Sequence, residues 1–221
     1  MADIRGSGAT ERVDFNANVV DYRWVMKDVP SLKEESYTST LRNHISRIEF
    51  QLASIGEPFT PRQVMSSWKM AAKDLLEDED FGEQLSKDNG WLNEVMPLAL
   101  RGATNVLAKA KNIYEWVRDN FTCTNYNRKY LEQPLKNVLK NRNGNVAEIN
   151  LLMTAMLRKA NIQADPVILS TRSHGYTHSA YPLMDRYNYV ICRTEAESKE
   201  FFLDACEPGK GFGKLDYKCY S

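Results

Sequence analysis

The fold is decided by one stretch, Gly144-Asn145-Val146-Ala147-Glu148-Ile149-Asn150-Leu151-Leu152-Met153-Thr154-Ala155-Met156-Leu157-Arg158-Lys159-Ala160. From Val146 onward, apolar residues occupy nearly every side of a helix. A helix that is hydrophobic all round is a buried one. A turn cluster at 141–145 precedes it, and Asn161 follows where a left-handed C-cap is expected. The stretch therefore predicts a buried central helix over 146–160.

Helices are also expected before this stretch. Thr60, Pro61 and Gln63 form a capping signal, which predicts a helix that begins at Thr60. Thr104 is expected to cap a second helix with a single apolar stripe. The members of that stripe are Val106, Ala110, Ile113 and Val117.

After the buried helix the pattern changes to strands. Strands are expected at 163–169, 187–193 and 201–204, with a turn near Glu197-Ser198. The polar and aromatic stretch 170–186 is too long for a simple connector, and loops of that length are often functional. The order of helix, buried helix and then several strands predicts an α+β fold with an antiparallel sheet packed on the central helix.

The N-terminal part has a different character. Residues 1–10 are expected to be a disordered leader or a cloning remnant, without the apolar core of a signal peptide. Residues 11–56 are interpreted as a β-strand segment, because 44–52 alternates apolar and polar residues and 14–24 is a weaker strand candidate. Such a segment is expected to be the end of an upstream domain. The main domain is assigned to 57–221.

Composition limits the classes of partner. The chain has 221 residues, 43% hydrophobic and 26% charged, and its formal net charge is zero. A balanced charge argues against nucleic acid as the main partner, since phosphate binding needs a surplus of Lys and Arg. No apolar run approaches the length that spans a bilayer, so direct membrane insertion is not expected. The four cysteines lack zinc-ligand spacing, and no cofactor is indicated.

Three segments together resemble the transglutaminase-like superfamily, which shares its fold with papain-type cysteine enzymes. The first runs from Ala108 to Asn120 and is similar to the helix before the family's active site. The second is the stretch 144–160, similar to the family's turn and buried helix. The third combines Tyr187-Asn188-Tyr189-Val190-Ile191 with Phe202-Leu203-Asp204-Ala205, similar to the strands that carry the family's His and Asp. The resemblance covers about residues 100–208.

A second resemblance concerns residues 14–55. They look like the end of a domain of unknown function that often precedes this core in bacterial envelope proteins. Trp24, Asp28-Val29-Pro30, Glu35 and the strand candidate that ends at Phe50 carry it. The resemblance implies a longer multidomain chain that is exported to the periplasm or cell envelope.

The resemblance also implies a catalytic Cys, His and Asp, and here the sequence departs from the family. The Cys position holds Val146, the His position holds Tyr189, and only Asp204 is of the expected type. The chemistry needs a thiolate and an imidazole that exchanges a proton near neutral pH. Valine has no nucleophilic atom, and a phenol with a pKa near 10 is a poor base. The sequence therefore predicts a degenerate triad in a module without catalysis.

Two alternatives remain open at this stage. A relocated nucleophile would use Cys123, Cys192 or Cys206 with an imidazole from the 170–186 loop, in an acyltransferase or peptidase. A metal site would use His174, His178 and an acid such as Asp185. The spacing of the two histidines suits a metal only on a helix, and Gly175 between them disfavours a helix.

For a module without catalysis, the former active-site cleft is the expected binding surface. Aromatic side chains near it suit stacking with a peptide or a sugar. The expected partners are a peptide, a glycan or a protein domain, and a purely structural role is the other option. The candidate cleft-binding residues are Asn145, Glu148, Tyr187, Tyr189, Asp204, His174 and His178.

Overall fold

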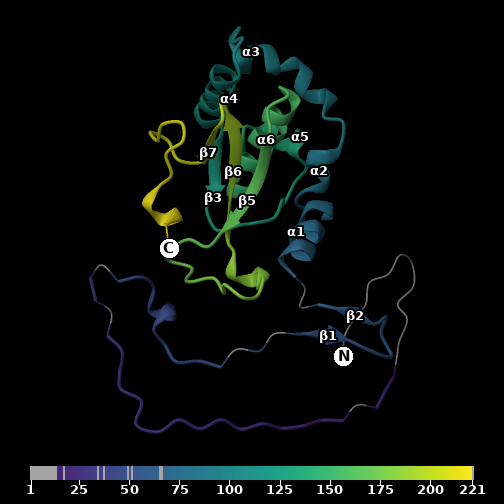
Figure 1. Ribbon diagram of the computed structural model, residues 1–221, viewed down its shortest axis with the longest axis vertical. Coiled ribbons are helices and arrows are strands. Elements are labelled where there is room, and N and C mark those ends of the chain that lie inside the picture. Colours follow the sequence, from purple (N-terminus) through teal and green to yellow (C-terminus); the bar gives the residue numbers. More distant parts are fainter. Residues whose placement is uncertain are drawn as a thin grey trace.

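The computed structural model describes residues 14–16, 18–33, 35–36, 38–48, 50, 52–64 and 67–220. Residues 67–220 form an α+β core in which helices surround a small central sheet, while the described residues of 14–64 run below the core (Figure 1). This confirms the predicted fold class. The expected leader at 1–10 lies outside the described residues.

The central helix α6 (Val146–Lys159) is buried along nearly its whole length, as its sequence predicts. It packs against strands β5 and β6 on one side and against helices α4 and α5 on others. A helix in contact with neighbours all round must be apolar on every face, which explains the composition of this stretch. Asn161, just after the helix, has a positive φ of 58° and confirms the expected left-handed residue.

The main sheet has three antiparallel strands in the order β5-β6-β7. The strands are β5 (Ala164–Leu169), β6 (Tyr189–Ala196) and β7 (Lys199–Leu203). A two-residue turn joins β6 to β7, and both Glu197 and Ser198 have positive φ, which matches the right-handed twist of the paired strands. The three strands and this turn confirm the sequence prediction, with small shifts at the ends.

A second, two-stranded sheet leads into α6. Strand β3 (Thr122–Asn125) pairs in parallel with β4 (Asn143–Asn145), which is directly followed by the first residue of α6. Helix α5 (Leu135–Asn141) lies between the two strands in the chain. The arrangement brings Cys123 opposite Gly144, beside the turn that begins the central helix.

Helices cover the rest of the core. The remaining elements are α1 (Trp68–Glu77), α2 (Glu83–Ser86), η2 (Gly90–Glu94), α3 (Met96–Leu100), α4 (Val106–Asn120), η3 (Met184–Arg186) and η4 (Tyr217–Cys219). The expected helix start at Thr60 is wrong, because Arg62–Gln63 forms strand β2 and the Ser67 hydroxyl caps α1 by accepting from the Met70 N–H. The Thr104 cap is off by one residue, since Asn105 Oδ1 accepts from the Ala108 N–H at 2.7 Å.

The N-terminal part differs from the expected β segment. The described residues of 14–24 and 44–52 have irregular backbone, and the strands here are only the short pair β1 (Ser54–Ile55) and β2 (Arg62–Gln63), with a 3-10 turn η1 (Leu41–Asn43). An isolated alternating segment has no neighbouring strand to supply hydrogen bonds, so period-two patterning alone does not create a sheet. Many large apolar side chains here are exposed, among them Val19, Tyr22 and Phe50.

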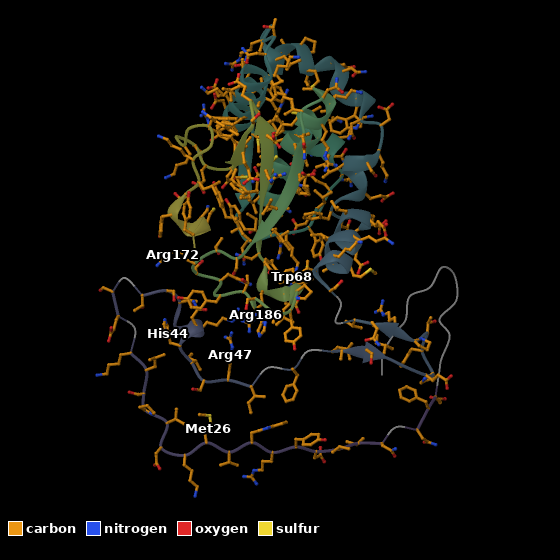
Figure 2. The ribbon with its side chains drawn as sticks, in the orientation of Figure 1. Met26, His44, Arg47, Trp68, Arg172 and Arg186 are labelled. Atoms are coloured by element: carbon orange, nitrogen blue, oxygen red, sulfur yellow. The ribbon has the colours of Figure 1, made fainter. Side chains whose placement is uncertain are left out.

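This segment meets the core at the loop between β5 and β6. Asn43 Oδ1 accepts from the Tyr176 N–H at 2.8 Å. Figure 2 shows Arg186 below the sheet with Arg47 of the N-terminal segment near it, while Met26 lies farther from the core. Burial lowers the pKa of Arg186, and the positive charges of Arg47 and Arg42 lower it further. The contact is therefore polar and charged, unlike the apolar packing around α6.

Candidate functional site

Val146 is the first residue of α6 and occupies the position where the resemblance places a nucleophilic Cys. Its side chain has no solvent exposure (0%) and belongs to the apolar core. The preceding residue, Asn145, caps the helix by accepting from the Glu148 N–H at 3.0 Å. Glu148 in turn accepts from the Asn145 N–H at 2.7 Å, which completes a capping box. The first turn of the helix is therefore fully capped, and at the position of the expected Cys it places the isopropyl group of Val146 in the core.

Glu148 also holds the segment before α5. Its second carboxylate oxygen accepts from the Glu132 and Gln133 N–H groups at 2.8 and 3.0 Å. The Asn145 amide donates to the Tyr130 carbonyl at 3.1 Å. Both polar side chains are buried, and their bonds go to protein backbone apart from one that Glu148 accepts from the Gln133 side-chain amide at 3.4 Å. Asn145 and Glu148 therefore organise the turn, and their predicted part in ligand binding stays a prediction.

Tyr189 and Asp204 are bonded to each other inside the protein. The Tyr189 hydroxyl donates to Asp204 Oδ2 at 2.8 Å, and the two residues are 0% and 1% exposed. Burial raises the pKa of Tyr189 far above its ordinary value, and the nearby Asp204 charge raises it further. A phenol in this state acts as a hydrogen-bond donor and is not a general base.

Asn150, on the inner face of α6, connects this pair to the rest of the core. Its amide nitrogen donates to Asp204 Oδ1 at 3.0 Å and to the Val190 carbonyl at 2.9 Å. Its amide oxygen accepts from the Ala205 N–H at 2.9 Å. Sequence reasoning did not single out Asn150. The available signal was one amide inside a helix that is otherwise apolar, since buried polar groups are nearly always hydrogen-bonded.

Asp204 is held by three donors. Besides Tyr189 and Asn150, the Cys206 N–H donates to its Oδ1 at 3.0 Å. Burial raises the pKa of Asp204, while the three hydrogen bonds partly oppose this shift. The carboxyl that orients an imidazole in the family is thus engaged with a phenol, an amide and a backbone N–H.

The cysteines differ sharply in their surroundings. Cys206 is buried with its Sγ 3.9 Å from the Val146 carbonyl, and burial raises its pKa. Cys123 is half-buried, and its pKa is lowered mainly by its interaction with Cys206, against the effect of burial. Cys192 is buried in β6, and burial raises its pKa to about 12. In the part of the chain that the structure describes, no histidine ring bonds to any of these thiols.

The two loop histidines have other partners. The His174 ring lies 3.2 Å from the Asp185 carbonyl, and His178 Nδ1 accepts from the Ala180 N–H at 3.2 Å. The loop is not helical over these residues. Among the described residues, no group of three or more His, Cys, Asp or Glu side chains is placed to hold a metal ion.

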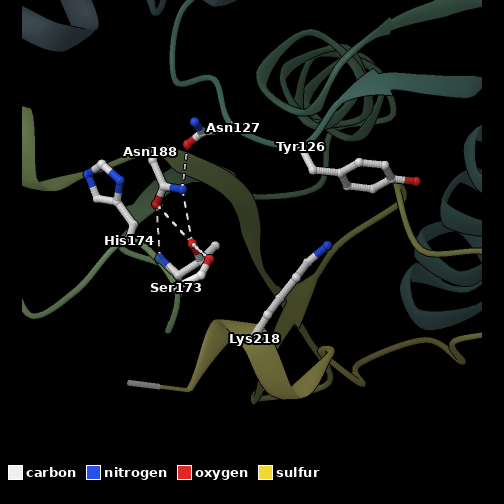
Figure 3. Close-up of a pocket in the computed structure, with 7 residues that line it drawn as sticks. Tyr126, Asn127, Ser173, His174, Asn188 and Lys218 are labelled. Carbon is white, nitrogen blue, oxygen red and sulfur yellow. Dashed lines mark hydrogen bonds between the residues drawn. The ribbon is translucent and has the colours of Figure 1, made fainter. Parts of the chain in front are cut away.

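Figure 3 shows a polar pocket of about 360 Å³, and one of its lining residues, Lys218, also lies over the Tyr189 ring. The pocket is bordered by the ends of β3, β5 and β6 and by the C-terminal segment. The lining residues are Tyr126, Asn127, Thr171, Ser173, His174, Asn188 and Lys218. The groups that this pocket presents are hydroxyls, amides, an imidazole, an amine and an aromatic ring.

Asn188 organises one wall of this pocket. Its amide nitrogen donates to Asn127 Oδ1 at 2.8 Å and to Thr171 Oγ1 at 3.0 Å (Figure 3). Its amide oxygen accepts from the Thr171 N–H at 2.9 Å. Ser173 and Thr171 have their hydroxyls 3.4 Å apart. The wall is therefore fixed by a network that leaves the outer amide and hydroxyl groups facing the pocket.

Lys218 separates the pocket from the buried pair. Its amine lies 4.3 Å from the centre of the Tyr126 ring and 4.9 Å from that of Tyr189. It also forms an ion pair with Glu207. Burial alone would lower the pKa of Lys218, but the bond to Glu207 raises it above the ordinary value. The sequence offered no signal for this role, because Lys218 lies outside the family motif and reaches the site only through the fold.

Of the seven predicted cleft residues, only His174 lines this pocket. Tyr189 and Asp204 are buried in the core, and Tyr187 packs edge-on against the Trp68 ring, 6.5 Å between centres. His178 is exposed on the loop beside Tyr181. The ligand role of these seven residues stays a prediction. Tyr126, Asn127, Thr171, Ser173, Asn188 and Lys218 are pocket residues that the predicted set does not contain.

None of the helices among the described residues is long and apolar enough to cross a membrane.

The Tyr126 hydroxyl donates to the Cys206 carbonyl at 3.1 Å. Burial, with the nearby thiol and carboxylate charges, raises the pKa of Tyr126 to about 12. The pocket floor is thus tied directly to the segment that follows Asp204.

Comparison with known proteins gives three results. The sequence model described as "Transglutaminase-like superfamily" matches residues 96–202. A search of the curated proteins finds no match. Two similar solved structures are a "putative protease" from Parabacteroides distasonis ATCC 8503 and a "putative cysteine protease" from Cytophaga hutchinsonii.

The structural similarities are partial. The Parabacteroides structure has 16% identity and a TM-score of 0.46, over 62% of this chain and 26% of that one. The Cytophaga structure has 14% identity and a TM-score of 0.41, over 62% of this chain and 42% of that one. The chain therefore spans less than half of either relative. The match to the family over 96–202 shows that the chain carries a domain of the transglutaminase-like superfamily.

Proposed function

We propose that this transglutaminase-like domain is a non-catalytic module that binds a peptide or a glycan chain in the pocket beside its former catalytic centre. The observation that carries the proposal is the state of the three triad positions. Val146 has no nucleophilic atom and is sealed in the core, and Tyr189 and Asp204 are bonded to each other. None of these three side chains supplies the thiolate or the imidazole that the family's chemistry needs.

The expected loss of rate is large. Removing the nucleophile or the base of such a unit costs about 10^4- to 10^6-fold in rate, and the losses are not repaired by the remaining carboxylate. Asp204 retains its place, but its role in a triad is to orient an imidazole. Here it receives the Tyr189 hydroxyl and helps to hold the core together. The bonded Tyr189–Asp204 pair therefore supports a structural role for this corner.

The pocket supports the binding half of the proposal. A volume of about 360 Å³ is within the range of small-ligand sites. The Lys218 amine is paired with Glu207, and the rest of the lining is rich in hydrogen-bonding groups. Amide and hydroxyl groups beside an aromatic ring suit the backbone of a peptide or the hydroxyls of a sugar.

Binding is tested with two probe libraries on the full chain. A library of random heptapeptides and a glycan microarray are screened, and the best hit of each is measured by isothermal titration calorimetry. We expect a binder from one library whose affinity falls at least tenfold in the Ser173→Ala and Asn127→Ala variants. The control is Ser54→Ala, which removes a hydroxyl from the exposed strand β1. No binder from either library would leave a partner domain or a structural role as the function.

Absence of catalysis is tested separately. The wild-type chain should give no covalent acyl-enzyme with an activated ester such as p-nitrophenyl acetate, as judged by intact mass. The Val146→Cys/Tyr189→His double variant restores both missing groups. Ester hydrolysis that appears only in this variant would show that the scaffold is competent and that only side chains were lost. A wild-type chain that forms an acyl-cysteine and also turns it over would overturn the proposal.

A second function has one observation in its favour. Cys123 has a lowered pKa beside Cys206, as a relocated nucleophile would need. This alternative is a cysteine-dependent acyltransferase or peptidase. Iodoacetamide titration of all four thiols across pH shows which thiol is reactive. Turnover of the acyl-cysteine then separates the two functions, because an acyl-transfer enzyme requires it. Reactivity at Cys123 without turnover of the ester agrees with the non-catalytic module.

The proposal includes the setting of the module. We place it in a longer chain exported to the bacterial periplasm or envelope, and the support is the resemblance of residues 14–55 and their many exposed apolar side chains. Fractionation of cells that express the native gene, with detection by an antibody to this domain, tests the compartment. A signal in the cytosolic fraction alone would reject it.

A further inference from the structure

Two thiols approach the first turn of α6 from different segments of the chain. Cys123 lies in β3, opposite Gly144 of the strand that leads into the helix. Cys206 follows β7, and its Sγ is 3.9 Å from the Val146 carbonyl. The Tyr126 hydroxyl, three residues after Cys123, donates to the Cys206 carbonyl at 3.1 Å. The end of β3 and the segment after β7 are therefore held side by side at this corner.

We propose that Cys123 and Cys206 are a redox-active pair that closes to an intramolecular disulfide across the former catalytic corner. The oxidant is a small-molecule disulfide of the glutathione class or a thiol–disulfide exchange protein. The corner then has reactive sulfur at two positions near Val146, and the reaction joins these two thiols to each other.

The two sulfurs have different tasks in the exchange. Cys123 is the more accessible, and its interaction with Cys206 favours its thiolate, which is the attacking species in thiol–disulfide exchange. Cys206 is buried, and burial keeps it as the thiol. Cys123 therefore reacts first with the external disulfide, and Cys206 resolves the mixed disulfide from inside.

The atoms and electrons balance as follows. The Cys123 thiolate attacks one sulfur of glutathione disulfide, and the glutathione thiolate that leaves takes up a proton. The Cys206 sulfur then loses its proton, attacks the Cys123 sulfur and releases the second glutathione. Two protein thiols lose two protons and two electrons in total. One glutathione disulfide becomes two glutathione molecules.

The other two cysteines provide internal comparisons. Cys192 lies buried in β6, hydrogen-bonded to the Arg193 carbonyl at 3.5 Å, and its pKa of about 12 keeps it protonated. Cys219 is half-buried near Asp204, and burial raises its pKa to about 12. Neither has the combination of access and a favoured thiolate that Cys123 has. Cys219 is the natural competitor, because it lies at the same end of the molecule.

Formation of this disulfide does not require a ligand in the pocket. A bond between Cys123 and Cys206 would join β3, which leads to the pocket residues Tyr126 and Asn127, to the segment after Asp204. It would close a large loop of chain around the central helix. Such a bond constrains the unfolded chain and raises the melting temperature of the oxidised protein.

The experiment uses the reduced full chain in glutathione buffers of stepwise increasing oxidised fraction. Samples are quenched in acid, free thiols are alkylated, and the peptic digest is analysed by mass spectrometry without reductant. We expect a linked peptide pair that contains Cys123 and Cys206, lighter by two hydrogens than the separate peptides. Cys192 and Cys219 should carry the alkyl label. Melting temperature should rise on oxidation and return with reductant.

The variants sharpen the assignment. The link and the rise in melting temperature should survive Cys192→Ser and disappear in Cys123→Ser and Cys206→Ser. Failure to find a Cys123–Cys206 peptide in the most oxidising buffer would overturn the proposal, as would a dominant link of either residue to Cys219 or a link formed only in denaturant. Because the wild-type peptide map decides alone, a variant that fails to fold does not weaken the test.

Discussion

The corner that contains Tyr189 and Asp204 and the polar pocket both include residues at or directly before the start of β6, yet the two regions differ in access to solvent. Asn188 lies in the pocket wall, whereas Tyr189, the next residue, points into the core. Successive side chains of an extended strand face opposite sides, so one step along the chain separates the two regions. The corner is therefore part of the core, while the neighbouring surface presents polar groups to the pocket.

The largest effect is expected at the hub of the buried corner. Asn150→Ala removes three hydrogen bonds and leaves the Asp204 carboxyl, the Val190 carbonyl and the Ala205 N–H without this partner. Buried groups left unsatisfied cost about 1–3 kcal/mol each, with partial relaxation, so we expect a loss of about 3 kcal/mol in the free energy of unfolding. Urea denaturation measures it.

The matched control is Asn137→Ala, on the exposed face of α5. It should change the unfolding free energy by no more than about 0.5 kcal/mol, as is usual for surface positions. An Asn150→Ala variant as stable as this control would mean that the corner is held together by apolar packing alone.

The second effect is on the pH dependence of stability. Burial raises the pKa of Asp204 in the native protein above its value in the unfolded chain, which is about 3.9. At a pH between these two pKa values, the folded state therefore binds more protons than the unfolded state. Its stabilising contribution is complete below the unfolded value and is lost as pH rises through the native pKa, by about 1.4 kcal/mol per unit of difference. Asp204→Asn should remove this decline in urea titrations between acid and neutral pH.

Asp216 supplies a control of opposite sign. The Lys218 N–H bond to Asp216 lowers the pKa of this carboxyl against the effect of burial, and Lys210 lowers it further. Its stabilisation is therefore present above the unfolded pKa and is lost as pH falls. Asp216→Asn should flatten the acid limb only. A wild-type stability that rises steadily from acid to neutral pH, unchanged by Asp204→Asn, would contradict the assignment for Asp204.

A smaller effect is expected for the phenol. Tyr189→Phe keeps the ring in the core but removes the hydroxyl that donates to Asp204 Oδ2. The expected cost is about 0.5–1.5 kcal/mol of unfolding free energy. Tyr217→Phe, which alters a tyrosine that is mostly exposed, is the control and should be silent. Equal stability of both variants would show that the Tyr189–Asp204 bond contributes nothing measurable.

The smallest effect on stability is expected in the pocket. Ser173→Ala removes an exposed hydroxyl that lies 3.4 Å from Thr171 Oγ1, and the unfolding free energy should change by less than about 0.5 kcal/mol. The melting temperature, measured by differential scanning fluorimetry, should therefore stay within about 2 °C of wild type. A large loss would mean that the pocket wall belongs to the structural core and does not face a ligand freely.

Sequence reasoning was most successful where one physical signal dominates. The run of apolar residues predicted α6, and the β-rich segments with a turn at Glu197-Ser198 predicted the sheet. It failed where the signal was local and ambiguous. Thr60 and Pro61 have the features of a helix start, but Ser67 makes the cap, because residues 62–63 pair with β1. The stretch 44–52 alternates apolar and polar residues, but its described residues form no strand.

The candidate site was predicted only in part. Val146, Tyr189 and Asp204 were identified from their position in the motif, and in the structure the last two are hydrogen-bonded to each other. Asn150 and Lys218 were not anticipated. The first is one amide in an apolar helix, and the second comes from a segment outside the motif. Their roles depend on contacts between residues far apart in the chain, which no local pattern reports.

The amino-acid sequence by itself determined the chemical inventory: which groups stand at the triad positions, and that no sulfur begins the central helix. Only the tertiary structure decided which of those groups reach water and which thiols become neighbours. The physical reason is that burial and proximity are properties of packed segments. Tyr189 is buried because Lys218 and α6 cover it, and Cys123 meets Cys206 because β3 and the end of β7 converge on one turn.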